Sequence, residues 1–167
     1  MTDFRADVLP LRHKIYRLAL HITGQREEAE DVVQETMLRV WQKLKEGGEI
    51  LNPEAFTITC ARHLALDAAG RHTGEQLDEQ TPQAATEGSS SPAHHAEQLD
   101  HREWLRRIVA AMPERQQTVL RLRDVERMSY KDIAAALCIS EDTVKVTIYR
   151  ARQRIRQEYE QIERYGL

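Results

Sequence analysis

The chain has 167 residues, of which 41% are hydrophobic, and a formal net charge of −3, which suits one or two small domains with hydrophobic cores. No apolar run approaches the roughly 18 residues of a membrane span, and the N-terminus lacks the apolar core of a signal peptide. Cys60 and Cys138 form neither a CxxC pair nor a disulfide framework. These features argue against membrane insertion and a zinc knuckle, and they predict a cytoplasmic protein.

The charge is unevenly distributed along the chain. Residues 1–100 carry 10 Lys and Arg against 17 Asp and Glu, whereas residues 101–167 carry 14 against 10. Aromatic residues make up only 5% of the chain, and there are seven glycines and five prolines. This composition favours an all-α protein whose acidic front and basic back have different partners.

Three helices are predicted in the front part, over residues 7–22, 26–45 and 53–71. Pro10 is tolerated if it lies in the first turn of the first helix, Gly47-Gly48 ends the second, and Asn52-Pro53 starts the third with Asn as cap. Each helix carries an apolar stripe at helical spacing. The stripes consist of Val8, Leu11, Ile15, Leu18 and Ile22, then Ala29, Val33, Met37, Val40 and Leu44, then Ile58, Ala61, Ala65 and Ala68.

The second and third helices each carry a further column of residues. Opposite the stripe of 26–45 lie Asp31, Gln34, Glu35 and Leu38, which fit either a partner surface or a solvated face with one stray leucine. Phe56, Cys60, His63 and Asp67 share a column on the third helix, either packed or facing a partner. One His and one Asp are too few ligands for a metal site.

Residues 73–100 are predicted to be a flexible acidic linker. They hold six acids, no Lys or Arg, two prolines and a Ser triplet, and they lack Val, Ile and every aromatic residue. Such a segment cannot bury enough apolar surface to offset its ordering entropy. His94-His95 within it is most simply a solvated polar pair.

Two helices are predicted after the linker, over residues 101–111 and 113–124. Trp104, Leu105, Ile108 and Val109 should point inward from the first helix, and Val119, Leu120 and Leu122 are apolar in the second. The chain thus forms two helical lobes, a front lobe of residues 1–72 and a back lobe of residues 101–167.

Residues 129–156 are typical of a helix-turn-helix whose second helix reaches about residue 160. Ser129 can cap the first helix with Asp132 bonding back to it, and Ser140 can cap the second. In the second helix Val144, Ile148, Ala151 and Ile155 form one apolar stripe. A recognition helix of this layout lies in the DNA major groove.

The second helix of this motif is strongly basic. Residues 143–157 contain five cations and no acid, which suits phosphate binding. Lys145, Arg150, Arg152 and Arg154 are candidates for DNA contact, and Val146 on the outer face could meet a thymine methyl. A solvated basic face on an ordinary amphipathic helix is the alternative interpretation.

Three segments together resemble the extracytoplasmic-function sigma factors of bacterial RNA polymerase. They are ITGQREEAEDVVQETMLRVW (22–41), ARHLALD (61–67) and the long run from MPERQQ to RQRIR (112–156). The resemblance implies sigma region 2 in residues 1–72, a linker over 73–100 and sigma region 4 in 101–167. It implies that region 2 binds the clamp helices of core RNA polymerase and opens the minus-ten element, and that region 4 binds the flap and reads the minus-thirty-five element.

The resemblance also assigns residues to these roles. Polymerase binding falls to Asp31, Gln34, Glu35 and Leu38, and the minus-ten element to Phe56, Arg62, His63 and Arg71. The upstream element falls to Lys131, Thr143, Lys145, Val146, Thr147, Tyr149, Arg150, Arg152 and Arg154. The partners are then the polymerase and promoter DNA, with a membrane-bound anti-sigma factor common in the family. No enzymatic activity, cofactor or metal is expected.

Several positions depart from the family pattern. Members of the family usually have Trp-Leu, Asn and a basic residue at three positions of region 2, where this chain has Phe56-Thr57, His63 and Gly70. In region 4 they often have Gly and Arg at two positions where this chain has Cys138 and Thr147. The substitutions fall on reading residues, so they bear on the promoter sequence. A stand-alone helix-turn-helix regulator explains only the back lobe and predicts tight DNA binding without polymerase, whereas an enzyme in the front lobe would rest on His63, Asp67 and the His94-His95 pair alone.

Overall fold

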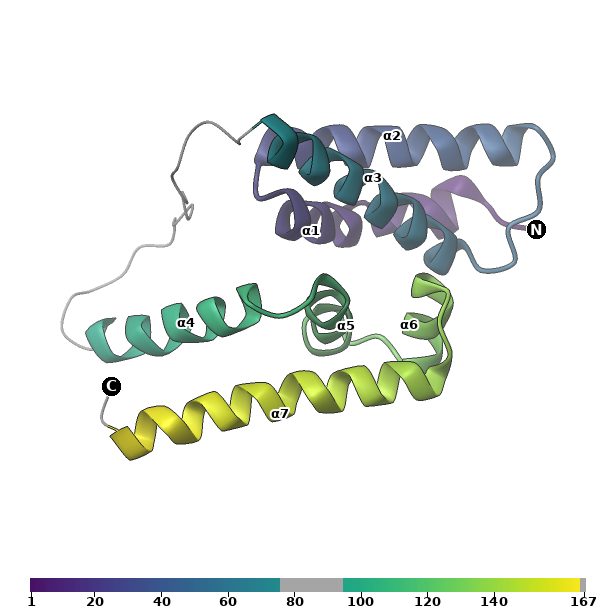
Figure 1. The fold of residues 1–167 in the computed structure, drawn as a ribbon. Coiled ribbons are helices and arrows are strands. Elements are labelled where there is room, and N and C mark those ends of the chain that lie inside the picture. The colour runs from purple at the N-terminus through teal and green to yellow at the C-terminus, as the bar shows by residue number, and fades with distance from the viewer. Residues whose placement is uncertain (76–94, 166–167) are drawn as a thin grey trace. The chain divides into compact units, whose positions relative to one another are not determined.

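The structure, a computed structural model, describes residues 1–75 and 95–165, and all the regular elements in those ranges are helical (Figure 1). The chain divides into two compact units, one built around α1–α3 and the other around α4, α5 and α7. The expected all-α class is confirmed. Residues 76–94, with most of the expected linker and His94, lie outside the described residues.

The helical structure of the front lobe begins before the predicted start at residue 7. Its first turn is wider than that of an α-helix, and the next turn is tighter. A π-helical turn, η1 (Phe4–Val8), and a 3₁₀ turn, η2 (Leu9–Leu11), precede α1 (Arg12–Thr23). Asp3 caps η1, because its Oδ1 accepts from the N–H of Ala6 over 2.8 Å. Pro10 therefore lies in the 3₁₀ turn η2 and not in the first turn of an α-helix. Its missing N–H is tolerated at the start of this turn as it would be in the first turn of an α-helix.

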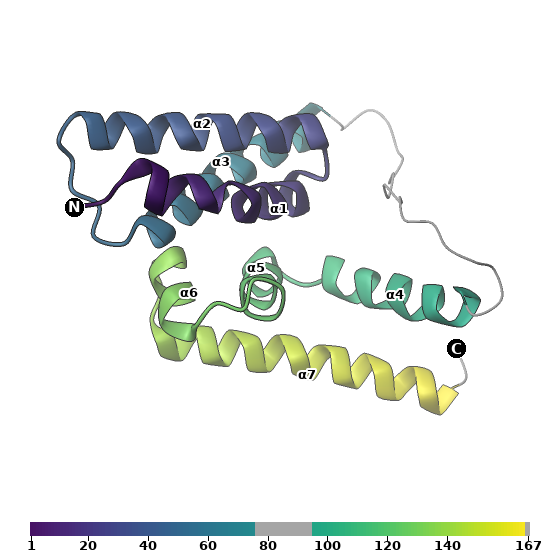
Figure 2. The ribbon, with the colours of Figure 1, turned by 180° about the vertical axis from the view of Figure 1, so that it is seen from behind.

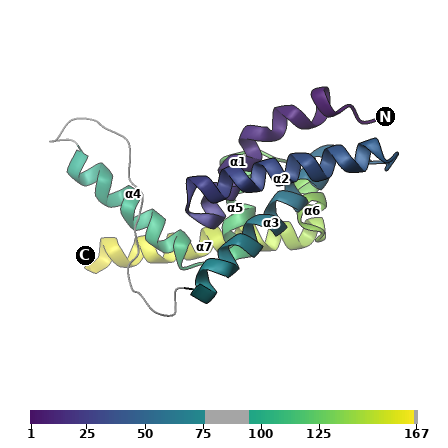
Figure 3. The same ribbon diagram turned by 90° about the horizontal axis from the view of Figure 1, so that it is seen from above.

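Helices α1, α2 (Arg26–Lys45) and α3 (Pro53–Glu75) pack on one another, and α3 crosses α2 obliquely (Figures 1 and 3). Gly24 and Gly47 end the first two helices with φ of 70° and 79°, a conformation that glycine adopts at little cost. Asn52 caps α3 as predicted, since its Oδ1 accepts from the N–H of Ala55 over 3.0 Å. Helix α3 continues to Glu75, past the predicted end at residue 71.

The core of the front lobe contains most of the predicted stripes together with buried residues that lie outside them. Val32 and Thr36 of α2 are buried although they lie outside the predicted stripe. The hydroxyl of Thr36 donates to the carbonyl of Val32 over 2.7 Å, so this polar group is satisfied inside its own helix. Helix α2 therefore buries one face against α1 and α3, and its wider, opposite face is exposed to solvent.

The back lobe contains α4 (His95–Ala110), α5 (Glu114–Asp124), α6 (Tyr130–Leu137) and α7 (Glu141–Tyr165). Helices α4 and α5 both pack against α7, while α6 stands at a steep angle to α7 across the turn (Figure 2). Helix α4 starts inside the segment expected to be linker, and α7 extends beyond residue 160. Leu105 is exposed, contrary to prediction, because α4 has only one packing stripe.

That stripe forms a small hydrophobic cluster with α7. Ile108 and Met112 are buried against Ala151, and Trp104 and Ile155 pack at its edge. The Trp104 ring also meets the ring of Tyr159 edge to face, with centroids 5.6 Å apart. Such apolar contact with α4 and α5 explains why α7 is far longer than groove reading requires.

Candidate polymerase and promoter interfaces

The predicted partner face of α2 is fully open to solvent. Asp31, Gln34, Glu35 and Leu38 are all exposed, and Leu38 retains 56% of its accessible surface. The carboxylate of Glu35 accepts from Nε of Arg39 over 2.7 Å. This hydrogen bond is the main cause that raises the pKa of Arg39. A single exposed leucine is normal on a solvated helix face, so this exposure fits both the partner surface and the solvated face that the sequence left open.

A groove of about 350 Å³ runs between α2 and α3 beside this face. Asp31 and Glu35 contribute from α2, and Arg71 contributes from α3. The groove thus brings together two residues predicted to bind polymerase and one predicted to contact the minus-ten element. The other residues that line it are Glu28, Val32, Leu64 and Ala68.

The other candidates for the minus-ten element differ in exposure. Phe56 is half-buried against the cluster of Val8, Val40 and Ile50, and Nζ of Lys43 lies 5.1 Å from its ring centroid. His63 is exposed and Arg62 is half-buried. The packing of Phe56 against this cluster favours a core role for its ring.

The two cysteines lie in different surroundings. Cys60 on α3 is half-buried, and this burial raises the pKa of its thiol, against the opposing effect of the nearby Arg39 guanidinium. Cys138 is exposed in the turn between α6 and α7. Within the described residues, no group of three or more His, Cys, Asp and Glu side chains is placed to hold a metal ion.

Both predicted caps of the helix-turn-helix are present. The N–H of Asp132 donates to Oγ of Ser129 over 3.1 Å, and that hydroxyl donates to Oδ2 of Asp132 over 2.8 Å. At the start of α7, the N–H of Thr143 donates to Oγ of Ser140 over 3.1 Å. These bonds satisfy N–H groups that have no partner inside the helices.

The turn between α6 and α7 contains a residue in the left-handed backbone conformation, which glycine adopts at a lower free-energy cost than other residues. Cys138 has φ of 55°, and the N–H of Ile139 donates to the carbonyl of Ala134 over 3.1 Å. This is the hydrogen-bonding pattern of a Schellman helix end. Cys138 therefore adopts the conformation that glycine would take, and the turn keeps its shape without glycine.

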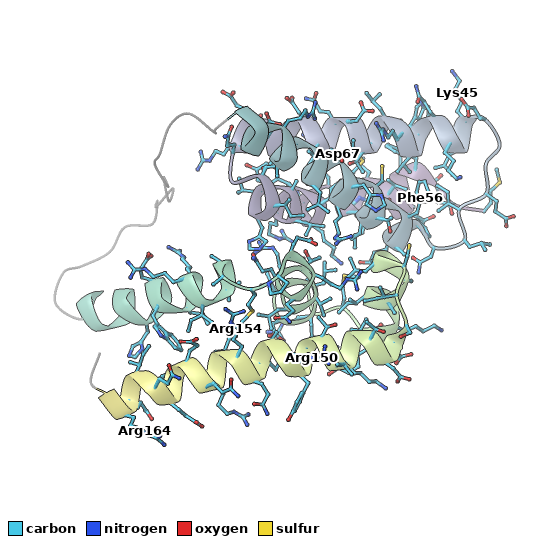
Figure 4. All side chains as sticks on the ribbon, viewed as in Figure 1. Lys45, Phe56, Asp67, Arg150, Arg154 and Arg164 are labelled. Carbon is cyan, nitrogen blue, oxygen red and sulfur yellow. The ribbon has the colours of Figure 1, made fainter. Side chains whose placement is uncertain are left out.

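The outer face of α7 presents most of the predicted DNA contacts. Lys145, Val146, Tyr149 and Arg150 are exposed, as is Lys131 on α6. Figure 4 shows Arg150 and Arg154 extending from the same helix; Arg154 is half-buried. Within the described residues, no salt-bridge partner accompanies Lys145 or Arg150.

Two of the residues predicted to contact DNA form hydrogen bonds within the back lobe. Thr147 keeps only 9% of its surface, and its hydroxyl donates to the carbonyl of Thr143 over 2.7 Å. Nη2 of Arg152 lies 2.7 Å from Oδ1 of Asp124 at the end of α5. Sequence reasoning missed Asp124, because an acid 28 residues from its cation gives no periodic signal.

A second groove, of about 610 Å³, lies between the start of α5 and the start of α7. Pro113, Arg115 and Gln116 line it on one side. The other side is formed by α7, through Asp142, Thr143, Val146, Thr147 and Arg150. Arg115 and Gln116 were not among the predicted contacts, because the pattern of α5 indicated only a packing role.

Family models identify two known regions in this chain. Models of "Sigma-70 region 2" and "Sigma-70, region 4" match residues 8–74 and 102–155. The chain is 32% identical over 143 residues to the ECF RNA polymerase sigma factor SigL of Mycobacterium tuberculosis, covering 85% of this chain and 80% of SigL. It is 28% identical to SigM of Bacillus subtilis over 148 residues, which are 87% of this chain and 88% of SigM.

Solved structures that share the fold include a sigma factor bound to its anti-sigma factor. The sigma factor RpoE of Bartonella quintana, in complex with the anti-sigma factor NepR, superposes with a TM-score of 0.68 at 20% identity, over 96% of this chain and 98% of that chain. Of the helices that the structure describes, none is long and apolar enough to cross a membrane. The sequence relatives and the two matched regions establish that this chain belongs to the extracytoplasmic-function sigma factors of RNA polymerase.

Proposed function

We propose that the two lobes of this sigma factor divide promoter recognition between them. The chain binds core RNA polymerase and directs promoter-specific initiation, while the polymerase supplies the chemistry in the cytoplasm. Residues 1–72 act as region 2, on the polymerase and the minus-ten element, and residues 101–167 act as region 4, on the minus-thirty-five element. Residues 73–100 act as the linker between them.

The α2 face is the proposed polymerase contact. Its support is the exposure of Asp31, Gln34, Glu35 and Leu38 on the side of α2 that does not pack against α1 and α3. Leu38 supplies apolar area, and the two carboxylates supply charge that selects a basic partner surface. The Glu35–Arg39 hydrogen bond fixes the orientation of the Glu35 carboxylate.

The outer face of α7 is the proposed reader of the upstream element, and this face carries the proposal for the back lobe. Lys145 and Arg150 project from it without salt-bridge partners in the described ranges, beside Val146 and Tyr149. Cations that reach phosphates set affinity, and side chains that reach base edges set sequence. Arg152, paired with Asp124, acts mainly by holding α7 against α5.

The minus-ten contact is assigned to the exposed side of α3. His63 and Arg71 are exposed there, so they can hold an unpaired base and a phosphate of the melted strand. Arg62 and Phe56 are the further residues assigned to this contact. An anti-sigma factor is proposed as a further partner, supported by the complex in which the Bartonella quintana relative was solved.

Run-off transcription tests this assignment. The full chain would be added to sigma-free core polymerase with promoter fragments from the source genome, and the transcripts sequenced. Discrete starts are expected, and they should vanish with the Asp31→Ala/Glu35→Ala variant but persist with Glu46→Ala, an exposed acid at the end of the same helix. Tight promoter binding by the chain alone, with no polymerase-dependent transcripts, would instead support a stand-alone regulator.

A further inference from the structure

We propose that Arg115, at the start of α5, binds a DNA phosphate of the upstream element and thereby fixes the register of α7 in the major groove. The proposal rests on the proposed function of the back lobe and adds a contact on α5, outside the helix-turn-helix. Its occupant is one strand of the duplex sugar-phosphate backbone. Arg115 is 35 residues away from Arg150 in the chain, yet both line one groove.

The groove is continuous with the proposed reading face. Thr143, Val146 and Arg150, all candidates for contact with the upstream element, form its α7 side, while Arg115 and Gln116 form its α5 side. A duplex whose major groove receives the start of α7 must bring a backbone strand alongside that helix. The α5 side of the groove is the surface that such a strand would meet.

The start of α5 is held in place by hydrogen bonds. Nε2 of Gln117 donates to the carbonyl of Met112 over 2.8 Å, and the hydroxyl of Thr118 donates to Oε1 of Glu114 over 2.6 Å. At the other end of the helix, Asp124 pairs with Arg152. Arg115 is thus carried by an element that is fixed to α7 at its far end, as a register-setting contact requires.

The charges on the groove suit a phosphate at the arginine side. Arg115 is exposed, and among the described residues it has no salt-bridge partner. Asp142 is the acid that lines the same groove, and its carboxylate repels a phosphate. The backbone strand should therefore lie toward Arg115 and Arg150, leaving Asp142 to accept a hydrogen bond from a base amino group.

The test measures binding of the reconstituted holoenzyme to its promoter duplex at several salt concentrations. Arg115→Ala should weaken binding about tenfold at 0.1 M salt, since one phosphate contact releases about 0.9 counterion. The slope of log affinity against log salt should fall by about one. The loss should be equal for every single-base variant of the upstream element, and Arg115→Lys should recover most of it. Arg106→Ala, at an exposed arginine on α4, is the matched control and should bind as the wild type does.

The outcomes separate this proposal from the function on which it rests. If Arg115→Ala binds as the wild type does, or loses affinity only for particular bases, the phosphate contact is overturned. Arg150→Ala in the same assay tests the reading face itself. If that variant leaves both affinity and base preference unchanged, the proposed role of the back lobe fails, whatever Arg115 does.

Discussion

Arg152 of α7 donates a hydrogen bond from Nη2 to Oδ1 of Asp124, over 2.7 Å, and so ties the end of α5 to the middle of the recognition helix. Both side chains remain about half exposed, at 50% and 46%. A pair with this exposure contributes only about 0.2–1 kcal/mol to stability. Its larger effect is geometric, because α5 forms one side of the groove at the start of α7.

Asp124→Ala and Arg152→Ala should therefore each destabilise the full chain by less than about 1 kcal/mol. Both variants should weaken promoter binding by the holoenzyme to a similar extent, because each releases the same contact. A double-mutant cycle on urea unfolding and on promoter affinity checks this expectation. If Arg152→Ala weakens DNA binding while Asp124→Ala does not, Arg152 contacts DNA directly.

Cys138→Gly should stabilise the protein by about 1 kcal/mol, since a side chain in the left-handed region costs about 1–2 kcal/mol, part of which the flexibility of glycine offsets. The measurement is the shift in the urea midpoint at unchanged slope. Ala135→Gly, at an exposed position inside α6, is the control and should destabilise by about 1 kcal/mol. Destabilisation by Cys138→Gly would mean that the cysteine side chain makes contacts that outweigh its strain.

Much of this architecture follows from local sequence signals. Ser129, Ser140 and Asn52 predicted helix starts that the structure confirms, because a cap and its partner N–H lie within three residues. Burial of Val32 could not be predicted in the same way. It depends on two helices packing against α2, and a single-helix stripe does not reveal how wide the covered face is.

The candidate site residues also differ in whether a single helix or the packing between helices determines their position. The residues on the outer face of α7 follow from periodicity, because one helix determines which side chains point away from its own apolar stripe. The engagement of Arg152 by Asp124 and the position of Arg115 beside Arg150 depend on how α5 packs against α7. Contacts between helices distant in sequence carry no periodic signal. The sequence therefore predicted DNA contact for Arg152 in the same way as for Lys145 and Arg150.

Cys60 should react with thiol reagents more slowly than Cys138 at neutral pH. Burial raises the pKa of the Cys60 thiol, so less of the nucleophilic thiolate is present. Labelling of Cys60→Ser and Cys138→Ser, each with one remaining thiol, compares the two rates directly. Faster reaction at Cys60 would mean that its burial does not govern the reactivity of its thiol.

The same shift has a consequence for stability. The pKa of the Cys60 thiol is higher in the folded protein than in the unfolded chain, so the folded state holds the thiol proton more tightly. The contribution of this difference to the free energy of unfolding is complete below the unfolded pKa of about 8.5, and it is lost as the pH rises through the folded value. Unfolding measured from pH 7 to 10 should therefore show a decline that is smaller in Cys60→Ala. Equal declines in both proteins would show that other groups account for it.

Val146 should recognise the methyl group of a thymine in the upstream element. Its side chain keeps 46% of its surface and lines the same groove as Arg150. Burial of one methyl is worth about 0.8 kcal/mol. Replacing each thymine of the element by uracil, one at a time, should weaken wild-type holoenzyme binding at one position by about fourfold, the factor that this energy gives. Val146→Ala should bind the thymine and uracil duplexes almost equally there.

Val125→Ala is the matched control for that experiment, because Val125 is also exposed, at 54%, but lies at the end of α5 away from the groove. It should retain the full difference between thymine and uracil. Arg150→Ala tests the neighbouring contact, where loss of a bidentate pair with guanine costs about 1–3 kcal/mol at one base pair only. If Val146→Ala still distinguishes thymine from uracil at every position, the apolar reading at this residue is wrong, and a phosphate-only docking of α7 becomes the better account.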